Sequence, residues 1–355
     1  MVRLSTSEFE RCTVIVVNWN GGDDTAECLR SLAGQTAEGV TVDLLVVDNG
    51  STDGSADMIE RDFPDVSLLR TGRNLGFGGA VNRGIAASSG DYLILVNNDA
   101  VATPGFVDAL LAPLRVDPHV AAVTARILLT GRFEPAAPGD AGAYRRSDNT
   151  YWRRTTGPGV ELLNSTGNVV SRSGNGQDRS WLVPADTDDS PVGVFGFSGG
   201  GCALRRSALE DVGVFDESLF MYYEDTDLAW RLRRNGWDVV YAREATLRHR
   251  HAGSSGVTSR LFLVNNVRNR VIVSAKNGPP RMVLAALWRA VGSLVKSALH
   301  VVLRRDTAAR RRLVASALGL LGVVGRLPAA VVARRRLDRH SREPRSMISD
   351  WVVDD

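Results

Sequence analysis

The chain has 355 residues, of which 44% are apolar and 23% charged, enough for one large core with an appended region. This composition excludes a fibrous or intrinsically disordered chain. The net charge of +3 says little about partners, and we expect no nucleic acid among them. Basic residues concentrate near the C-terminus, with fifteen Lys or Arg against three Asp or Glu between Arg281 and Arg345.

The cysteines and the N-terminus indicate a cellular compartment. Cys12, Cys28 and Cys202 are scattered and have the spacing of neither a disulfide framework nor a metal site. A reducing cytosol is the simplest setting for such thiols. Residues 1–11 are polar and lack the apolar stretch of a signal peptide.

Short apolar runs alternate with amphipathic segments in the first third of the chain. Runs rich in β-branched residues that end in turn residues predict strands, and apolar spacings of three and four predict helices. We expect strands at 13–17, 42–47, 66–69, 93–96 and 120–123, and helices at 23–33, 55–61, 78–88 and 104–114. This alternation predicts a mostly parallel sheet with helices on both faces.

The segment 130–191 has a different character. It is rich in Gly, Ser, Asp, Asn and Arg, and its periodicity is weak. It is either a long mobile insertion or a lid built from small irregular elements. After it, we expect strands at 202–204 and 239–241 and helices at 207–212 and 225–234.

The C-terminal part has a helical pattern. One polar stripe along the first helix contains Ser293, Lys296, His300 and Arg304. A second apolar run, 313–325, ends before Arg326 and Pro328. A spanning helix needs about 20 apolar residues, and we expect neither run to meet that requirement. Arg-rich flanks favour helices on a membrane surface, and the alternative is packing on the catalytic domain or a second subunit.

Two predicted strands end in acidic, turn-forming residues. Asp48 follows the strand 42–47, and Asp99 follows the strand 93–96. Ligands of open α/β sheets bind beyond such strand ends. The Asp48 carboxylate is able to accept hydrogen bonds from a base or sugar, and Asp99 is able to bind Mg²⁺ together with phosphates. Local turn formation explains either stretch equally well.

An acidic cluster begins the helix expected near residue 225. Glu224, Asp225 and Asp227 there match the positive end of the helix dipole. Aromatic residues precede them closely, which is typical of a cleft wall, and a carboxylate in a cleft is able to deprotonate a hydroxyl. His249 and His251 follow the last strand and either ligate a metal or hydrogen-bond within a loop.

Several of these segments occur in a specific order between residues 13 and 256. They are Asn18-Trp19-Asn20, Asp48-Asn49-Gly50-Ser51-Thr52-Asp53, Arg73-Asn74-Leu75-Gly76-Phe77-Gly78, Asn82-Arg83-Gly84, Asn97-Asn98-Asp99, Gly200-Gly201-Cys202-Ala203-Leu204, the stretch 215–227, and His249 ahead of Ser254-Ser255-Gly256. Together they resemble glycosyltransferase family 2, inverting nucleotide-sugar transferases of the GT-A fold. The set is most similar to the rhamnosyltransferase branch, which builds bacterial cell-wall and surface polysaccharides.

The resemblance implies where the nucleotide sugar binds. By position, Asn18, Asp48, Arg73 and Asn74 would line the nucleotide pocket. Asp99 would lie at the diphosphate, in the last position of the family's Asp-x-Asp motif.

The resemblance also implies a metal site and a base. Asn97 replaces the first aspartate of the motif, so Asp99 keeps the only carboxylate and His249 would complete the site for Mg²⁺ or Mn²⁺. Asp225 matches the family's base, in the pair Glu224-Asp225. The Gln-x-x-Arg-Trp motif of processive members is absent, which favours transfer of a single sugar.

The expected activity is therefore transfer of L-rhamnose from dTDP-rhamnose to a glycan or polyprenyl-diphosphate-linked acceptor. We expect a peripheral protein on the cytoplasmic face of a bacterial membrane. The expected regions are a nucleotide-sugar half at 1–125, an insertion or lid at 126–193, an acceptor and catalytic half at 194–277, and a basic helical region at 278–355.

Three alternatives remain open. A family 2 enzyme with a galactofuranosyl, mannosyl or glucosyl donor shares all of these motifs. A nucleotidyltransferase shares the sheet, but its glycine-rich loop carries a basic residue that 18–22 lacks. A membrane-bound scaffold with a degenerate sugar-nucleotide site is favoured by Asn97 and opposed by the intact Glu224-Asp225 pair.

Overall fold

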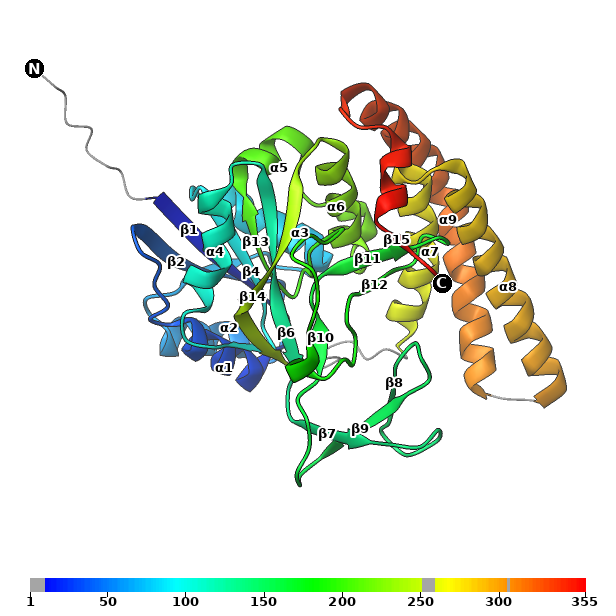
Figure 1. Ribbon diagram of the computed structural model, residues 1–355, viewed down its shortest axis with the longest axis horizontal. Helices are drawn as coiled ribbons and strands as arrows, with labels where there is room; N and C mark the ends of the chain where they lie inside the picture. The colour runs from blue at the N-terminus through cyan, green and yellow to red at the C-terminus, as the bar shows by residue number, and fades with distance from the viewer. Residues whose placement is uncertain (1–9, 251–258, 305–306) are drawn as a thin grey trace, which may run out of the picture.

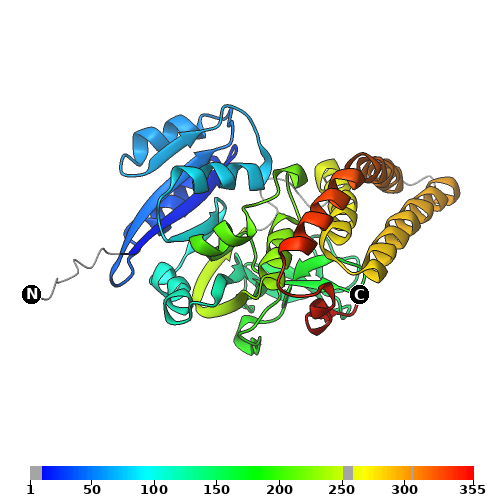
Figure 2. The same cartoon turned by 90° about the horizontal axis from the view of Figure 1, so that it is seen from above.

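The computed structural model describes residues 10–250, 259–304 and 307–355. His251 and the Ser254-Ser255-Gly256 motif lie outside the described residues. A central sheet carries helices on both faces, and three further helices stand at the end opposite the first strands (Figures 1 and 2).

The central sheet contains nine strands in the order β3-β2-β1-β4-β13-β6-β14-β5, with β10 paired to β6. Its strands are β1 (Glu10–Asn18), β2 (Val40–Asp48), β3 (Ser67–Arg70), β4 (Tyr92–Asn97), β5 (Ala100–Ala102), β6 (Val120–Leu129), β10 (Leu163–Ser165), β13 (Gly201–Arg205) and β14 (Asp238–His249). The first four strands in this order run parallel, as predicted. β13 runs antiparallel to β4 and β6, which departs from the parallel pattern. The apolar side chains of β13 are buried on both faces of the sheet, so their pattern is compatible with either strand direction.

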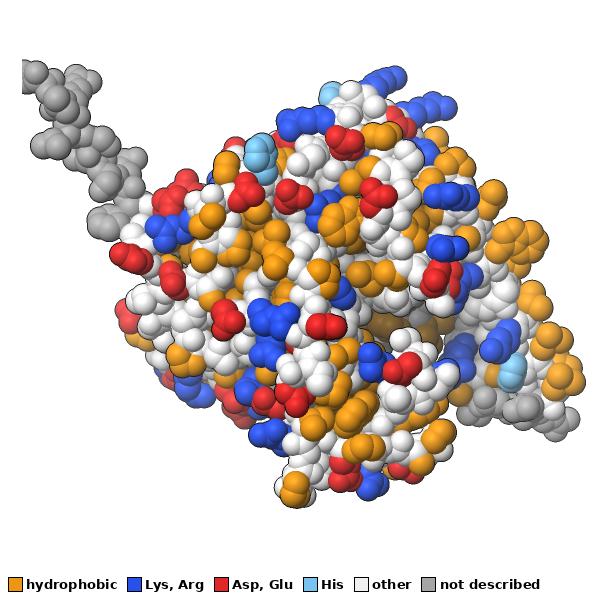
Figure 3. Space-filling view, viewed as in Figure 1, with side chains coloured by type: hydrophobic (Ala, Val, Ile, Leu, Met, Phe, Trp, Pro, Cys, Tyr) orange, Lys and Arg blue, Asp and Glu red, His pale blue; other side chains and the backbone are white. Residues whose placement is uncertain are grey.

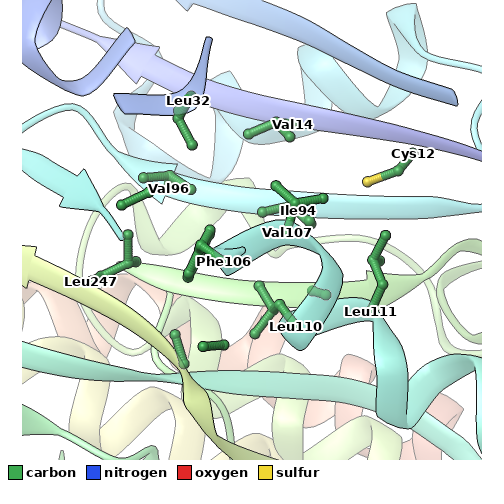
Figure 4. Close-up of a cluster of buried hydrophobic side chains, with 14 of the residues drawn as sticks. Cys12, Val14, Leu32, Ile94, Val96, Phe106, Val107, Leu110, Leu111 and Leu247 are labelled. Atoms are coloured by element: carbon green, nitrogen blue, oxygen red, sulfur yellow. The ribbon is translucent and has the colours of Figure 1, made fainter. Parts of the chain in front are cut away.

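Six helices cover the two faces. Helices α1 (Gly22–Leu32), α2 (Ser55–Asp62) and α4 (Phe106–Val116) pack on one face, and α3 (Gly76–Ala87), α5 (Arg206–Val212) and α6 (Glu224–Arg234) pack on the other. Within β1, Val14 faces the first core and Ile15 the second, because successive side chains of a strand point to opposite faces. Figure 4 shows Val14 and Ile94 beside Phe106 in the first core. The predicted α/β architecture is confirmed.

The segment 126–193 forms small ordered elements. They are β7 (Arg132–Pro135), β8 (Tyr144–Arg145), β9 (Tyr151–Thr155), β11 (Asn168–Ser171), β12 (Gly176–Asp178) and the 3₁₀ turn η1 (Ala185–Thr187). β11 and β12 form an antiparallel hairpin, which we call the β11–β12 arm. The short strand β15 (Val352–Val353), from the end of the chain, pairs with β11. Of the two predicted alternatives, the description as small irregular elements fits this segment.

The C-terminal helices pack on the catalytic part. They are α7 (Arg260–Asn277), α8 (Pro280–Arg304) and α9 (Thr307–His340), and the 3₁₀ turn η3 (Arg345–Asp350) follows them. These three helices share a core with Phe195 and with Trp230 of α6, the helix that the 3₁₀ turn η2 (Glu217–Leu219) precedes. α9 packs closely against α7 at Gly319. A Cβ added at Gly319 would stand only 2.9 Å from Val267.

The outer faces of α8 and α9 remain apolar and exposed. Leu284, Trp288, Val295 and Leu299 are more than half exposed and follow one side of α8, and hydrophobic side chains line the α8 edge of the molecule in Figure 3. By length and composition alone, residues 280–303 and 308–340 are each long and apolar enough to cross a membrane. Our expectation that neither run is long enough was therefore wrong, because the helices extend well beyond the runs that we counted.

Candidate functional site

A cavity of about 1020 Å³ opens at the carboxyl ends of β1 and β4. It is bounded by the loop 74–77, the β11–β12 arm, the first turn of α6, the end of β14 and residues 353–355. Figure 3 shows the molecule hollowed between the β11–β12 arm and the β7–β9 sheet. Of the two acidic residues at strand ends that the sequence singled out, Asp99 lines this cavity, and Asp48 is represented only by its neighbour Asn49.

Asp99 and His249 lie together in this cavity although 150 positions separate them. The pairing of His249 with Ala100, between β14 and β5, sets this proximity. The Asp99 Oδ1 atom lies 3.0 Å from His249 Nε2. His249 Nδ1 lies 2.7 Å from Asn164 Oδ1, and Asn97 Nδ2 lies 3.3 Å from His249 Nε2. Asp99 Oδ1 and His249 Nε2 thus present an oxygen and a nitrogen atom to the same part of the cavity.

This donor pair fits a hard divalent cation. Neighbouring ligands in octahedral coordination at about 2.1 Å are about 3 Å apart, close to the observed separation. The described residues contain no group of three or more His, Cys, Asp or Glu side chains suited to a metal. Mg²⁺ commonly keeps only one or two protein carboxylates and takes its other ligands from substrate phosphates and water. Asp99 and His249 would therefore hold such an ion jointly with a diphosphate.

A strained loop delivers the acids of α6 to the cavity. Phe220, Tyr222 and Tyr223 all have positive φ, between 66° and 73°. Non-glycine residues adopt this conformation only where surrounding contacts enforce it. One such contact is the hydrogen bond from Phe77 N to Phe220 O, at 2.7 Å. Gly76 permits this approach, because a Cβ there would stand 2.1 Å from the Phe220 carbonyl oxygen.

Glu224 is buried and Asp225 is half-buried, and their carboxylates have unequal surroundings. Asp225 accepts hydrogen bonds from the Thr226 and Gly199 backbone N–H groups at 2.6 and 3.3 Å. Burial raises the pKa of Asp225, and these donors oppose the rise. Burial and the adjacent Asp225 charge raise the pKa of Glu224, whose Oε2 has no hydrogen-bond partner among the described residues. The backbone N–H donors therefore favour the charged form of Asp225 over that of Glu224.

Asp227, the third acid of the predicted cluster, points away from the cavity. It contacts Lys276 Nζ at 2.9 Å, Arg231 Nε at 3.0 Å and Asn277 Nδ2 at 2.8 Å. Burial disfavours its charge, but Lys276 and Arg231 outweigh burial and lower the pKa of Asp227 to about 2. Lys276 also binds Asp216 at 2.8 Å. Asp227 thus joins α6 to α7.

The predicted nucleotide residues fall into two groups. Asn74 lines the cavity, and Arg73 is exposed immediately before it. Asn18 and Asp48 are buried, and Asn18 Nδ2 donates to Asp48 Oδ1 at 2.9 Å. Asn18 and Asp48 do not line the cavity, whereas the neighbouring Trp19 and Asn49 do. Nucleotide binding by Asn18, Asp48, Arg73 and Asn74 stays a prediction.

Sequence reasoning missed the residues that the segment 126–193 brings to the cavity. Asn164, Asn168 and Asp178 all line it. Asn168 is 8% exposed, and its Oδ1 has no hydrogen-bond partner among the described residues. The only available signal was an unusual density of polar residues in a segment of weak periodicity, and that signal does not single out positions.

Comparison with known proteins places this geometry in a family. The model for "Glycosyl transferase family 2" matches residues 13–213, and that for "Glycosyl transferase family group 2" matches residues 175–266. The chain is 32% identical to the N-acetylglucosaminyl-diphospho-decaprenol L-rhamnosyltransferase of Mycobacterium tuberculosis, over 84% of this chain and 95% of that protein. It is 27% identical to the pre-mycofactocin glycosyltransferase of the same species, over 67% of this chain and 42% of that protein.

Solved structures share the fold. GalNAc-T7 with UDP, GalNAc and Mn²⁺ superposes with a TM-score of 0.57 at 14% identity, over 91% of this chain and 58% of that chain. The mannosyltransferase PcManGT from Pyrobaculum calidifontis, in complex with GDP-Man and Mn²⁺, gives a TM-score of 0.50 at 17% identity, over 90% of this chain and 87% of that chain. The strand-end cavity, the family models and the rhamnosyltransferase relative agree, and the chain belongs to glycosyltransferase family 2 as an inverting glycosyltransferase with a GT-A-like fold.

Proposed function

We propose that this enzyme transfers a single L-rhamnosyl residue from dTDP-rhamnose to an N-acetylglucosaminyl-diphospho-polyprenol. The observation that carries the proposal is the similarity to the mycobacterial rhamnosyltransferase along almost the whole length of that protein. In this assignment residues 1–125 bind the nucleotide, 194–277 bind the acceptor and supply the base, and 126–193 close over the sugar.

Asp225 is the proposed general base. Its charge is held by two backbone N–H groups, and its carboxylate lines the cavity. The Asp225 carboxylate takes the proton from the acceptor hydroxyl as that oxygen attacks the anomeric carbon. The new C–O bond forms on the face opposite the diphosphate, the bond to the diphosphate breaks, and the anomeric centre inverts. A β-L-rhamnosyl donor therefore gives an α-L-rhamnoside.

Asp99 and His249 would hold Mg²⁺ or Mn²⁺ at the opposite side of the cavity. The ion supplies positive charge that compensates the departing diphosphate. Asn164 Oδ1, 2.7 Å from His249 Nδ1, would hold the imidazole in place beside this ion. Asn97 Nδ2, 3.3 Å from Nε2, contributes no charge, so Asp99 is the sole carboxylate of this site.

The exposed side of α8 is the proposed contact with the membrane that carries the acceptor. Trp288 is 75% exposed among other apolar side chains, and basic residues flank both helices. Such a surface suits the interface of an anionic leaflet. In liposome flotation, Trp288→Glu is expected to reduce the bound fraction while transfer to a water-soluble acceptor is unchanged. Equal flotation of both proteins would contradict this contact.

The donor is tested by thermal denaturation with Mn²⁺ and dTDP-rhamnose, UDP-galactofuranose or GDP-mannose. A ligand of the native state at 100 times its Kd adds about 2.7 kcal/mol of stability. We expect dTDP-rhamnose to give the largest rise in Tm, and transfer to N-acetylglucosaminyl-diphospho-polyprenol to follow by mass spectrometry. A rise in Tm with GDP-mannose or UDP-galactofuranose alone would identify that nucleotide sugar, and not dTDP-rhamnose, as the donor. No rise in Tm with any of the three would favour the scaffold with a degenerate site.

A further inference from the structure

The β11–β12 arm is fixed against the first turn of α6. Gly176 lies so close to α6 that a Cβ there would stand 2.7 Å from Thr226 Oγ1. The Tyr223 hydroxyl donates to Asn175 Oδ1 at 3.0 Å. Because Asp225 lies between Tyr223 and Thr226 in sequence, these contacts set the position of the arm relative to the proposed base.

The other side of the arm is held by the end of the chain. β15 pairs with β11 through Val170 and Ser171. Asp355 accepts hydrogen bonds from the Ser171 and Ser173 hydroxyls, both at 2.5 Å, and pairs with Arg289 of α8 at 3.0 Å. The arm is therefore a braced element of the cavity wall.

Asp178 ends this arm inside the cavity. It pairs in the β-ladder with Asn168, and both residues line the cavity. The pKa of Asp178 is raised to about 6, mainly by burial and also by the charge of Asp225. A hydrogen bond from Ser165 and the nearby His249 oppose this rise. Asp178, Asp225 and His249 thus line one cavity, and the hairpin that carries Asp178 contacts the first turn of α6, which carries Asp225.

Those two neighbours define what occupies the space beside Asp178. Asp225 faces the acceptor hydroxyl, and His249 lies where the diphosphate leaves. The sugar in transfer has to span the gap between them. A carboxylate beside a sugar ring accepts hydrogen bonds from its hydroxyl groups.

We propose that Asp178 binds hydroxyl groups of the transferred sugar and thereby selects the donor. This inference rests on the proposed nucleotide-sugar transfer and assigns a specificity role to a residue of the segment 126–193. Asp178 touches the ring and not the nucleotide, so its removal weakens binding of the nucleotide sugar without weakening binding of the nucleoside diphosphate.

Titration calorimetry with Mn²⁺ tests this separation. dTDP and dTDP-rhamnose are titrated into wild type, Asp178→Ala, Asp178→Asn and the control Asp186→Asn, which alters an exposed acid of the same segment. A hydrogen bond to a charged group corresponds to a loss of about tenfold or more when it is removed. We expect the Kd of dTDP-rhamnose to rise at least about tenfold in Asp178→Ala and less in Asp178→Asn. The Kd of dTDP should stay within about twofold throughout.

Deoxy donors identify the hydroxyl. A dTDP-rhamnose analogue that lacks the bound hydroxyl should bind wild type and Asp178→Ala equally, because the partner is already missing.

Each other outcome has a distinct meaning. Unchanged dTDP-rhamnose affinity in both Asp178 variants overturns the inference and leaves the proposed function standing. Loss of dTDP affinity in Asp178→Asn overturns it as well, since Asp178 then acts on the nucleotide or on the fold. A wild type that binds dTDP but no nucleotide sugar overturns the proposed function itself.

Discussion

The two sides of α6 carry acidic residues with opposite surroundings. On the cavity side, Glu224 and Asp225 form no ion pair with a Lys or Arg among the described residues, and the pKa of each is raised. On the inner side, Asp227 is enclosed by Lys276 and Arg231, and its pKa falls to about 2. All three acids belong to one helical turn. The difference separates an acid whose charge is balanced by two cations, and which joins α6 to α7, from the acid that we propose as the base.

The largest effect is expected from Asp225→Asn. The amide keeps the shape of the carboxylate but accepts no proton, so kcat should fall by about 10²–10⁴-fold. Donor binding and Tm should stay near wild type, because the amide oxygen is still able to accept the hydrogen bonds from the Thr226 and Gly199 backbone N–H groups. Steady-state kinetics and calorimetry measure the two quantities. Wild-type turnover in Asp225→Asn would remove this residue from the role of base.

Asp227→Asn should act on stability instead. It leaves Arg231 and Lys276 buried with less compensating charge, and breaking a buried ion pair costs about 3–5 kcal/mol. Urea unfolding should show that loss, with Asp225→Asn as the matched control two positions away. If both variants unfold at the same urea concentration, the distinction between the two sides of α6 fails.

Much of this arrangement was predictable from local sequence. The strands and the acids at their ends follow from apolar runs and turn residues, which are local signals. The direction of β13 was not predictable, because a strand buried on both faces has no directional pattern. The roles of Asp225 and Asp227 also needed the structure, since Lys276 reaches Asp227 from another helix, 49 positions away. Asp178 enters the cavity through a hairpin whose pairing involves the end of the chain.

The pH dependence of stability sharpens the same contrast. The pKa of Asp227 lies at about 2 in the fold against an ordinary value of 3.8, so the unfolded chain takes up its proton first as pH falls. The stabilisation, about 2 kcal/mol, is fully present above pH 3.8 and is lost as pH falls through 2. Unfolding free energies of wild type and Asp227→Asn, measured between pH 5 and 2, should therefore converge toward the acid end. A constant difference would show that Asp227 is not the titrating group.

Asp99 is an intermediate case, since its facing group is the imidazole of His249 and not a permanent cation. Asp99→Ala removes the only carboxylate of the proposed ion site. Loss of such a ligand should weaken Mn²⁺-dependent donor binding by about tenfold or more. Calorimetry of dTDP with and without Mn²⁺ measures this effect, and the metal-independent part of the affinity should be unchanged. Full wild-type activity in the presence of a chelator would contradict the metal site.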